Sequence, residues 1–374
     1  FDARVDDARL TLALVRTAAF HGATVTNHAE VIETTRDQHG KVNGAIVYAD
    51  AREIRIKARV VIMATGVWLR DWNGLKKGEA SPLNIRPAKG VHVAIPWMKI
   101  RNDCTVTIPV AGRSRRATIT RWGNVSYLGT TDEDYQGDLN DVHCNRTELD
   151  FLLEGANSAL KTDLRPEDVV GSIAGCRPLV GVAGGKTVEM KRNHEIRVSA
   201  DGLITIVGGK LTTSRHMAEE TIDAASKILG RKKAYSTKTA YLLGAAGYDP
   251  QAILASGGLS AHLGERYGTE AHFVSDIIQA DPSLMKPIVA GLPYTEAEVV
   301  YAVRHELAST IDDVLSRRIR ARLMARDASA NAAQRVGEIL QQELKLQPEQ
   351  VARQVASYQT AIKHEKSMLM GTSE

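Results

Sequence analysis

The chain has few cysteines, and those it has are far apart. Among its 374 residues only Cys104, Cys144 and Cys176 carry a thiol. They show no C-x-x-C spacing, which argues against a zinc site and against a disulfide framework. We therefore expect no metal centre, and we expect the protein to occupy a reducing compartment, the cytoplasm.

Long apolar runs and a strong net charge are also absent. No stretch of about 18 apolar residues occurs, so no segment is predicted to span a bilayer. A formal charge of +4 is small for a chain of this length. It does not indicate a nucleic-acid-binding protein. A small anionic substrate would need only a local cluster of arginine and lysine.

One basic segment leaves peripheral contact with the inner membrane open. It could touch acidic lipid, but a solvated helix face is the simpler interpretation. We expect the helical region that contains it to act as a cap or as the dimerisation unit of a homodimer. The arginines of this segment are Arg317, Arg318, Arg320, Arg322 and Arg326.

A glycine pair precedes a predicted helix in the stretch IVGGKLTTSRHMAEETID, residues 206–223. The P-loop pattern requires a glycine five positions before Gly209, but Ile204 stands there, so a nucleotide-triphosphate cradle is excluded. The free amides at such a helix start attract negative charge. The alternative is a plain glycine turn that joins a strand to a helix.

The first part of the chain predicts a helix and then a small antiparallel sheet. Residues 6–21 have an acidic start and an apolar stripe typical of a helix. Alternating stretches within residues 24–57 predict three strands. The continuous apolar run Val60–Met63 predicts a strand buried on both faces of a parallel sheet. The small residues that follow would let a ligand approach the backbone. They are Ala64, Thr65 and Gly66.

Further strands and a helix are predicted in the middle of the chain. Residues 90–132 are rich in strand patterns, with a hairpin turn at Gly123-Asn124. A capping-box pattern at Thr147 and Asp150 predicts a helix that runs to Leu160. Another strand pattern follows at residues 168–181. From about Tyr248 the strand patterns stop, and a capping box at Thr295 and Glu298 opens a helical run through residue 323.

Four side chains beside strand ends or glycine turns are candidates for chemistry. His92 lies among apolar residues at strand spacing, where most histidines are ordinary strand residues. Arg177 precedes Pro178, and its guanidinium suits a phosphate or a carboxylate; the alternative is a pairing with a carboxylate of the chain. Arg192 belongs either to a basic site or to a solvated charge run. The fourth candidate is Lys210.

Taken together, eight segments resemble the FAD-dependent glycerol-3-phosphate dehydrogenases. GGKLTT after a strand, AGCRPL and the RHE helix are the most specific, whereas ATG occurs in many flavoproteins. The segments run in the family's order from Asp2 to about Tyr358. They are DDARL, VVIMATGVW, KGVHVAIP, YLGTTDEDY, SIAGCRPL, KRNHEI, IVGGKLTTSRHMAEE and VVYAVRHELASTIDDVLSRR.

The resemblance implies an α/β fold with three parts. A partial FAD-binding domain of the glutathione-reductase type is expected from residues 1–80 and 181–232. A mixed β-sheet substrate domain is expected from residues 81–180, and an all-helical C-terminal domain from residues 245–374.

The resemblance also implies a reaction, in which sn-glycerol 3-phosphate loses a hydride from C2 to FAD and becomes dihydroxyacetone phosphate. Arg177 and Arg192 are expected to anchor the phosphate, because a bound dianion needs at least two cationic partners. His92 is expected to hydrogen-bond the C2 hydroxyl and act as the base. Lys210 is expected to act at the flavin or at the substrate, and the sequence does not separate these roles.

Three segments are expected to hold the cofactor. The glycine turn and the first helical amides would meet the pyrimidine side of the flavin, where reduction places negative charge, and a Cβ there would keep the backbone away from the ring. Residues 64–66 would lie by the pyrophosphate and ribitol, and the backbone of Val31 by the adenine. The turn is formed by Gly208, Gly209 and Lys210, and the first residues of the expected helix are Leu211, Thr212 and Thr213.

One family feature is absent from the chain. No GxGxxG fingerprint occurs, although the family carries it upstream of the segment that matches Phe1. We therefore expect an N-terminal piece to be missing and this chain alone to be inactive. The expected electron acceptor is quinone, or oxygen as in some branches. Two alternatives stay open: another FAD-dependent oxidase or dehydrogenase of an amine or 2-hydroxy acid, and an inactive fragment.

Overall fold

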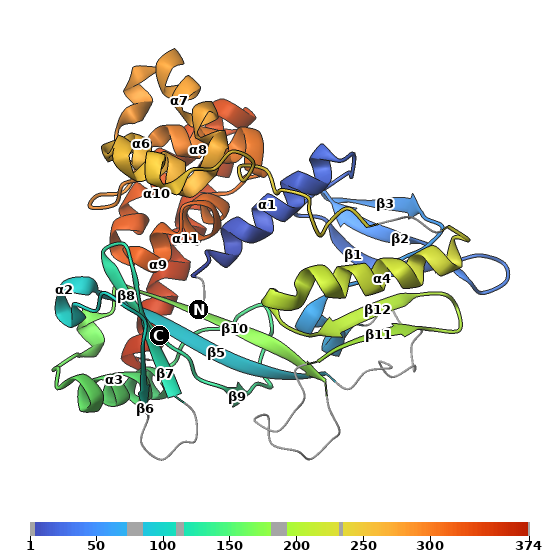
Figure 1. Ribbon diagram of the computed structural model, residues 1–374, viewed down its shortest axis with the longest axis horizontal. Coiled ribbons are helices and arrows are strands. Elements are labelled where there is room, and N and C mark those ends of the chain that lie inside the picture. The colour runs from blue at the N-terminus through green and yellow to red at the C-terminus, as the bar shows by residue number, and fades with distance from the viewer. Residues whose placement is uncertain (1–3, 73–84, 110–115, 181–192, 232–234, 373–374) are drawn as a thin grey trace.

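The described residues form three sheets, several helices that lie between their strands in the sequence, and a group of C-terminal helices (Figure 1). A computed structural model describes residues 4–72, 85–109, 116–180, 193–231 and 235–372. Within these ranges, no helix combines the length and the apolar character that crossing a bilayer requires. We retain the segments 1–80, 81–180, 181–232 and 245–374 as a proposed division into domains.

The N-terminal helix and the small sheet confirm the sequence prediction. Helix α1 (Asp7–Phe20) is capped by Asp6, whose carboxylate accepts hydrogen bonds from the amides of Ala8 and Arg9 at 3.1 and 3.3 Å. The three strands that follow form an antiparallel sheet in the order β1-β2-β3. They are β1 (Glu30–Arg36), β2 (Val42–Ala49) and β3 (Arg52–Lys57).

A second sheet contains β4 (Ile62–Met63), β11 (His194–Val198) and β12 (Ile204–Gly208), in the order β11-β12-β4. The predicted parallel pairing of the first of these strands is confirmed, since β4 runs parallel to β12. The predicted burial on both faces is wrong: Met63 is 5% exposed but Ile62 is 37% exposed. Strand β4 lies at the edge of this sheet, where one side chain of the pair lacks cover.

The third sheet has six strands in the order β10-β5-β8-β7-β6, with β9 paired to β5. Alternate residues of β5 face a core that includes Val91, Val93 and Ile95 and is covered by helix α3 (Arg146–Leu160). The hairpin at Gly123-Asn124 joins β7 to β8, as predicted. The strands are β5 (Ile85–Pro96), β6 (Val106–Pro109), β7 (Arg116–Trp122), β8 (Val125–Gly129), β9 (Glu133–Asp134) and β10 (Gly171–Val180).

Helix α3 ends where predicted but begins differently. The predicted capping box at Thr147 and Asp150 is wrong. Asn145 is the N-cap: its side chain accepts from the Glu148 amide at 2.9 Å, and Glu148 accepts from the Asn145 amide at 3.1 Å. Asparagine caps at least as well as threonine, so the earlier residue begins the helix.

The C-terminal region is helical, as predicted, and has its own core around the buried Val299, Tyr301 and Leu315. The capping box of Thr295 and Glu298 is confirmed. The predicted helical run through residue 323 is interrupted, because Leu307 is left-handed with φ 57° and a π-helical turn follows at Asp313–Arg318. The helices are α5 (Pro250–Ser256), α6 (Gly258–Tyr267), α7 (Ala271–Ala280), α8 (Glu296–Glu306), α9 (Ala321–Met324), α10 (Arg326–Leu344) and α11 (Pro348–Met370).

The five arginines of the basic segment do not form an exposed face. Arg318, Arg320 and Arg326 are buried. Arg318 pairs with Asp313 at 3.2 Å, and Arg320 with Asp7 at 3.2 Å. Neither the lipid-contact nor the solvated-face interpretation therefore holds for these three residues, because their side chains are buried and form internal ion pairs.

The helical region is packed directly on the six-stranded sheet. Helices α9 and α11 lie beside its strands (Figure 1). A Cβ at Gly171 of β10 would lie 2.6 Å from the Leu323 carbonyl carbon, so glycine permits this close approach. Leu369 of α11 enters the core beneath the sheet.

Candidate functional site

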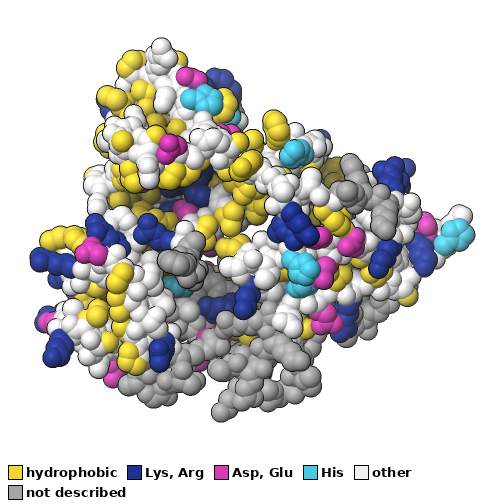
Figure 2. Space-filling view, viewed as in Figure 1, with side chains coloured by type: hydrophobic (Ala, Val, Ile, Leu, Met, Phe, Trp, Pro, Cys, Tyr) yellow, Lys and Arg dark blue, Asp and Glu magenta, His cyan; other side chains and the backbone are white. Residues whose placement is uncertain are grey.

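One face of the six-stranded sheet is turned away from the core and carries two of the predicted site residues. On β5, His92 alternates with the core residues Val91 and Val93 and therefore points to the opposite face. Arg177 of β10 pairs with Ala88 of β5 and lies on this same face. Figure 2 shows a hollow between the C-terminal helices and the sheet, with basic side chains gathered along it.

Arg177 lies across β5 above Gly90. A Cβ at Gly90 would lie 2.7 Å from the guanidinium carbon, so only glycine leaves room for this side chain in its present position. Its Nη2 donates to Thr130 Oγ1 at 3.0 Å, and its Nη1 pairs with Asp132 Oδ1 at 3.3 Å. The side chain is still 33% exposed, whereas Asp132 is 1% exposed. The predicted pairing with a carboxylate therefore exists, and it fixes the guanidinium without covering it.

His92 lies over a second glycine. A Cβ at Gly129 of β8 would lie 2.7 Å from His92 Nε2, and Tyr127 stacks on the imidazole with centroids 4.5 Å apart and planes 4° apart. The pKa of His92 is lowered from 6.5 to about 4. Burial is the largest cause and the positive charge of Arg177 is the next, whereas the negative charge of Asp7 raises the pKa. The imidazole is therefore neutral at neutral pH and able to accept a proton.

The glycine turn after β12 has the conformation that only glycine adopts easily. Gly208 and Gly209 have φ values of 78° and 79°. A Cβ at Gly209 would lie 2.8 Å from Met217 Cε, and one at Gly208 would lie 2.7 Å from the Asn193 carbonyl oxygen. The glycines are therefore required by the chain's own packing, in addition to any ligand that approaches them.

A 3-10 turn, η4 (Leu211–Thr213), precedes helix α4 (Ser214–Ile228), so the α-helix begins three residues later than predicted. The Thr213 amide donates to the Lys210 carbonyl at 3.0 Å and is thus used within the turn. The Leu211 and Thr212 amides come first in the turn and have no acceptor within it. They are the amides that can face an anion.

Arg177 and Lys210 line the same pocket of about 260 Å³. The pocket lies where the end of β10 meets the turn after β12; Val180 Cγ2 is 3.4 Å from the position that a Gly208 Cβ would occupy. Two segments that are 33 residues apart in sequence thus bring two cationic side chains to one cavity, which suits an anion. The other lining residues are Pro178, Leu179, Gly208, Gly209 and Leu211.

Residues 64–66 follow β4 and lie close to this turn, because β4 runs parallel to β12 and both strands end at the same edge. Gly66 has φ 58°, and nothing lies within 4 Å of the position of its Cβ. Thr65 Oγ1 is buried and has no hydrogen-bond partner among the described residues. A buried hydroxyl without a partner, next to an open glycine, fits a polar ligand at this edge.

The described lining of the pocket does not include His92, Val31 or residues 64–66. Val31 lies in β1 of the three-stranded sheet, paired with Val47. Its contact with adenine stays a prediction. Arg192 lies outside the described residues, and its place in the site stays a prediction.

Several residues that shape the site were missed from the sequence. Gly90 and Gly129 make room for Arg177 and His92, and Tyr127 supports the imidazole. These glycines face the side chains across strand pairs, so the pairing register had to be known. Strand alternation places Tyr127 and Gly129 on one face, which is the only signal the sequence offers.

Two family models match the chain. Residues 1–224 match the FAD-dependent oxidoreductases, and residues 235–351 match the C-terminal domain of alpha-glycerophosphate oxidase.

Similar proteins are found among curated sequences and solved structures. The chain is 32% identical over 378 residues to glycerol-3-phosphate dehydrogenase 2 of Mycobacterium tuberculosis, which covers 98% of this chain and 64% of that relative. It is 36% identical over 338 residues to glycerol-3-phosphate dehydrogenase 1 of the same organism, covering 86% and 62%. The chain thus spans less than two thirds of the length of these relatives.

The structure of a glycerol-3-phosphate dehydrogenase from Bacillus halodurans complexed with FAD superimposes with a TM-score of 0.81. The sequences are 25% identical, and the match covers 98% of this chain and 73% of that chain. Together with the family models, this similarity confirms the predicted fold class: an FAD-dependent oxidoreductase fold of mixed α/β content with a helical C-terminal domain.

Proposed function

The chain belongs to the family of FAD-dependent glycerol-3-phosphate dehydrogenases, and on this premise we propose that the protein oxidises sn-glycerol 3-phosphate to dihydroxyacetone phosphate with FAD as its redox cofactor. The observation that carries the proposal is the meeting of Arg177 and Lys210 in one pocket. A phosphate monoester carries close to two negative charges at neutral pH, and two cationic side chains can offset the hydration that it loses on binding.

The residues at the end of β4 and β12 fit the cofactor. The buried hydroxyl of Thr65 lacks a partner among the described residues, Gly66 is open, and the Gly208-Gly209 turn exposes backbone amides. These groups would hold polar parts of FAD. When bound, FAD supplies the acceptor for the hydride that leaves C2 of the substrate.

Each of the described site residues then has a role in the proposed reaction. Arg177, fixed by Thr130 and Asp132, binds the phosphate through the part of its guanidinium that remains exposed. His92 accepts the proton of the C2 hydroxyl, which a neutral imidazole with a pKa of about 4 can do throughout the neutral range. Lys210 and the first amides of the turn, at Leu211 and Thr212, stabilise negative charge in the pocket.

The quinone acceptor is a further part of the proposal and rests on the family resemblance alone. It is tested by comparing turnover of glycerol 3-phosphate with a soluble quinone and with oxygen as the acceptor. Faster turnover with oxygen would replace quinone in the proposal without changing the substrate.

The substrate is tested by comparing kcat/KM for glycerol 3-phosphate with that for lactate and sarcosine in the FAD-loaded protein. We expect the phosphate ester to be preferred by at least about 100-fold, or about 3 kcal/mol, because lactate and sarcosine lack the phosphate dianion that makes charge-assisted hydrogen bonds in this pocket. Lactate represents the 2-hydroxy acids and sarcosine the amines. Equal turnover of either one would remove the phosphate ester from the proposal.

Replacing Gly90, the glycine beneath Arg177, tests the phosphate site while the arginine itself is kept. Gly90→Ala is expected to raise KM for glycerol 3-phosphate by about 10-fold, because the new methyl group displaces the flexible guanidinium rather than the backbone. The melting temperature should change little. Gly175→Ala is the matched control, since Gly175 pairs with Gly90 across the strands and has open space around its Cβ position. An equal KM for the two variants would contradict the role of Arg177.

A further inference from the structure

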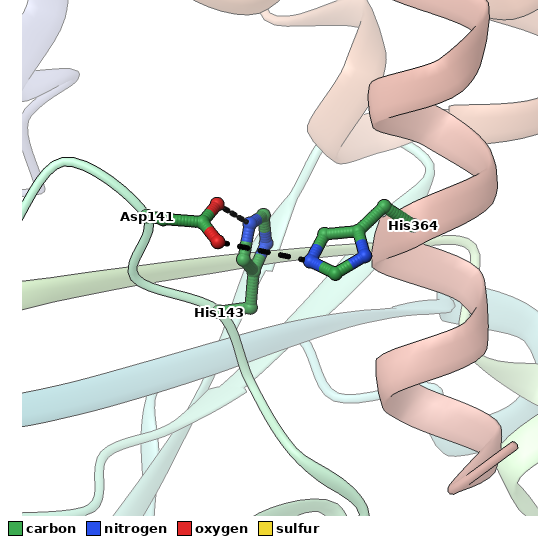
Figure 3. Close-up of side chains that lie close together, drawn as sticks. All are labelled: Asp141, His143 and His364. Carbon is green, nitrogen blue, oxygen red and sulfur yellow. Dashed lines mark hydrogen bonds and ion pairs between the residues drawn. The ribbon is translucent and has the colours of Figure 1, made fainter. Parts of the chain in front are cut away.

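A histidine and carboxylate cluster lies where the loop before α3 meets helix α11. Figure 3 shows the carboxylate of Asp141 directed toward the imidazoles of His143 and His364. Asp141 Oδ1 is 2.7 Å from His143 Nε2, and Asp141 Oδ2 is 3.9 Å from His364 Nε2. The two rings are 4.8 Å apart and nearly perpendicular, at 85°. One potential ligand atom from each residue lies within 4.8 Å of the others.

The loop side of the cluster is held by neighbouring groups. Lys89 Nζ donates to the His143 carbonyl at 2.9 Å, and the Tyr135 hydroxyl donates to the Asp141 carbonyl at 3.3 Å. The N-cap Asn145 follows two residues after His143 and fixes the chain at the start of α3. The backbone that carries the two loop ligands is therefore restrained before any ion binds, which lowers the ordering cost of binding.

The helix side is held equally well. Glu365, next to His364, is buried and accepts a hydrogen bond from the Ser172 amide of β10 at 3.0 Å. Leu369 lies in the core under the sheet, and Arg146 of α3 donates to the Met370 carbonyl at 3.4 Å. These contacts fix the last turns of α11 on the sheet and present His364 to the loop.

We propose that Asp141, His143 and His364 bind one Zn²⁺ ion, which joins helix α11 to the substrate-domain sheet. Two imidazoles and one carboxylate form a ligand set that zinc accepts, with a water molecule in the fourth position. The side chains are 61%, 19% and 37% exposed in that order, so an ion can enter and a water molecule can complete the site. The expectation of no metal rested on cysteine spacing and did not consider histidines distant in sequence, and this proposal departs from it.

The geometry requires only small side-chain movements. Ligand atoms on a tetrahedral zinc ion lie about 3.3 Å apart, as follows from bonds of about 2.0 Å. The Asp141 and His143 atoms must separate slightly, and ligand atoms that lie up to 4.8 Å apart must approach by up to about 1.5 Å. Rotation about the side-chain torsions of partly exposed residues supplies such shifts, while the restrained backbone stays in place.

The cluster is separate from the proposed redox site. Lys89, which donates to the His143 carbonyl, lies three positions before His92 on β5. Residues an odd number of positions apart on a strand point to opposite faces of the sheet, so these two side chains do so. The zinc ion would therefore act on the attachment of the helical region rather than on the reaction. The inference does not depend on the proposed function.

The test is a zinc titration of the protein after removal of metal with EDTA, measured by competition with a chromophoric chelator. The expected result is one Zn²⁺ per chain and a rise in melting temperature that EDTA reverses. MgCl₂ should produce neither effect, because magnesium binds oxygen ligands and not imidazole.

Variants locate the binding. His364→Gln, His143→Gln and Asp141→Asn should each weaken zinc binding by at least about 10-fold and abolish the melting-temperature rise. His216→Gln is the matched control, because His216 and His194 both pair with Glu220 in another surface group of histidines and a carboxylate. It should bind zinc as the unaltered protein does.

Three results would overturn the proposal. They are the absence of stoichiometric zinc binding, binding that survives all three cluster substitutions, and binding that is lost in the His216 variant instead. Comparing the melting temperatures of the metal-free variants shows whether each is folded. Because the three cluster residues are at least partly exposed, at least one of the three variants is expected to melt like the unaltered protein and so to give an interpretable titration.

Discussion

Replacing Arg177 by alanine is expected to lower kcat/KM for glycerol 3-phosphate by about 100- to 1,000-fold. The substitution removes charge-assisted hydrogen bonds to the phosphate and breaks the ion pair with the buried Asp132. Activity on glycerol, which lacks the phosphate, should be low in both proteins and nearly unchanged by the substitution. Steady-state kinetics with the two substrates make the comparison.

Two further variants show whether the guanidinium itself matters. Arg177→Lys keeps the charge but loses the planar fork, so an intermediate loss is expected. Arg165→Ala removes an exposed arginine that pairs with Asp163 and should leave kcat/KM unchanged. A loss under threefold for Arg177→Ala, or an equal fractional loss on glycerol, would contradict phosphate binding by this residue.

Replacing His92 by glutamine is expected to lower kcat by about 100- to 10,000-fold, the usual range for removal of a general base. The pKa of about 4 adds a pH dependence with a definite sign. The base is neutral, and active, above this pKa and becomes protonated below it. The acid limb of kcat for the unaltered protein, measured at saturating substrate, should therefore lie near pH 4, and it should be absent from the residual activity of His92→Gln.

The acid limb separates a base from a residue that only packs. His272→Gln is the matched control, since His272 is exposed and its Nδ1 pairs with the Thr269 carbonyl at 2.8 Å. It should change neither kcat nor the pH profile. An acid limb near pH 6.5, or a kcat within threefold of normal in His92→Gln, would rule His92 out as the base.

Local patterns in the sequence were sufficient for most of the elements. Alternation predicted the three strands β1, β2 and β3, and side-chain chemistry predicted the caps at Asp6 and at Thr295. Each of these depends on residues within four positions of one another. A single sequence is enough to predict these strands and caps, because the residues that form them are close together in the chain.

The predictions that failed depended on distant parts of the chain or on competition between neighbouring residues. Ile62 is exposed because β4 lies at the edge of its sheet, and its apolar run carries no information on where the sheet ends. The local pattern predicts a cap at Thr147, but Asn145 begins the helix two residues earlier. The arginine pattern of residues 317–326 indicates a surface face, but a carboxylate from a remote segment, Asp7, pairs with Arg320.

For the site, the sequence identified the reactive side chains but not their supports. His92 lies within β5, Arg177 lies within β10 and Lys210 follows the glycine turn. All three belong to sequence segments that carry the family resemblance. Gly90 and Gly129 support them across strand pairs, and no local pattern encodes a pairing register. The Asp141, His143 and His364 cluster was missed for the same reason, since α11 returns to the sheet from the far end of the chain.

The most direct test of the phosphate site is a crystal structure of the FAD-loaded protein with glycerol 3-phosphate. We expect phosphate oxygens within about 3 Å of the Arg177 guanidinium, in the pocket that Lys210 also lines, and the C2 oxygen beside the His92 imidazole. A phosphate bound away from Arg177, or a C2 oxygen out of reach of His92, would contradict the account.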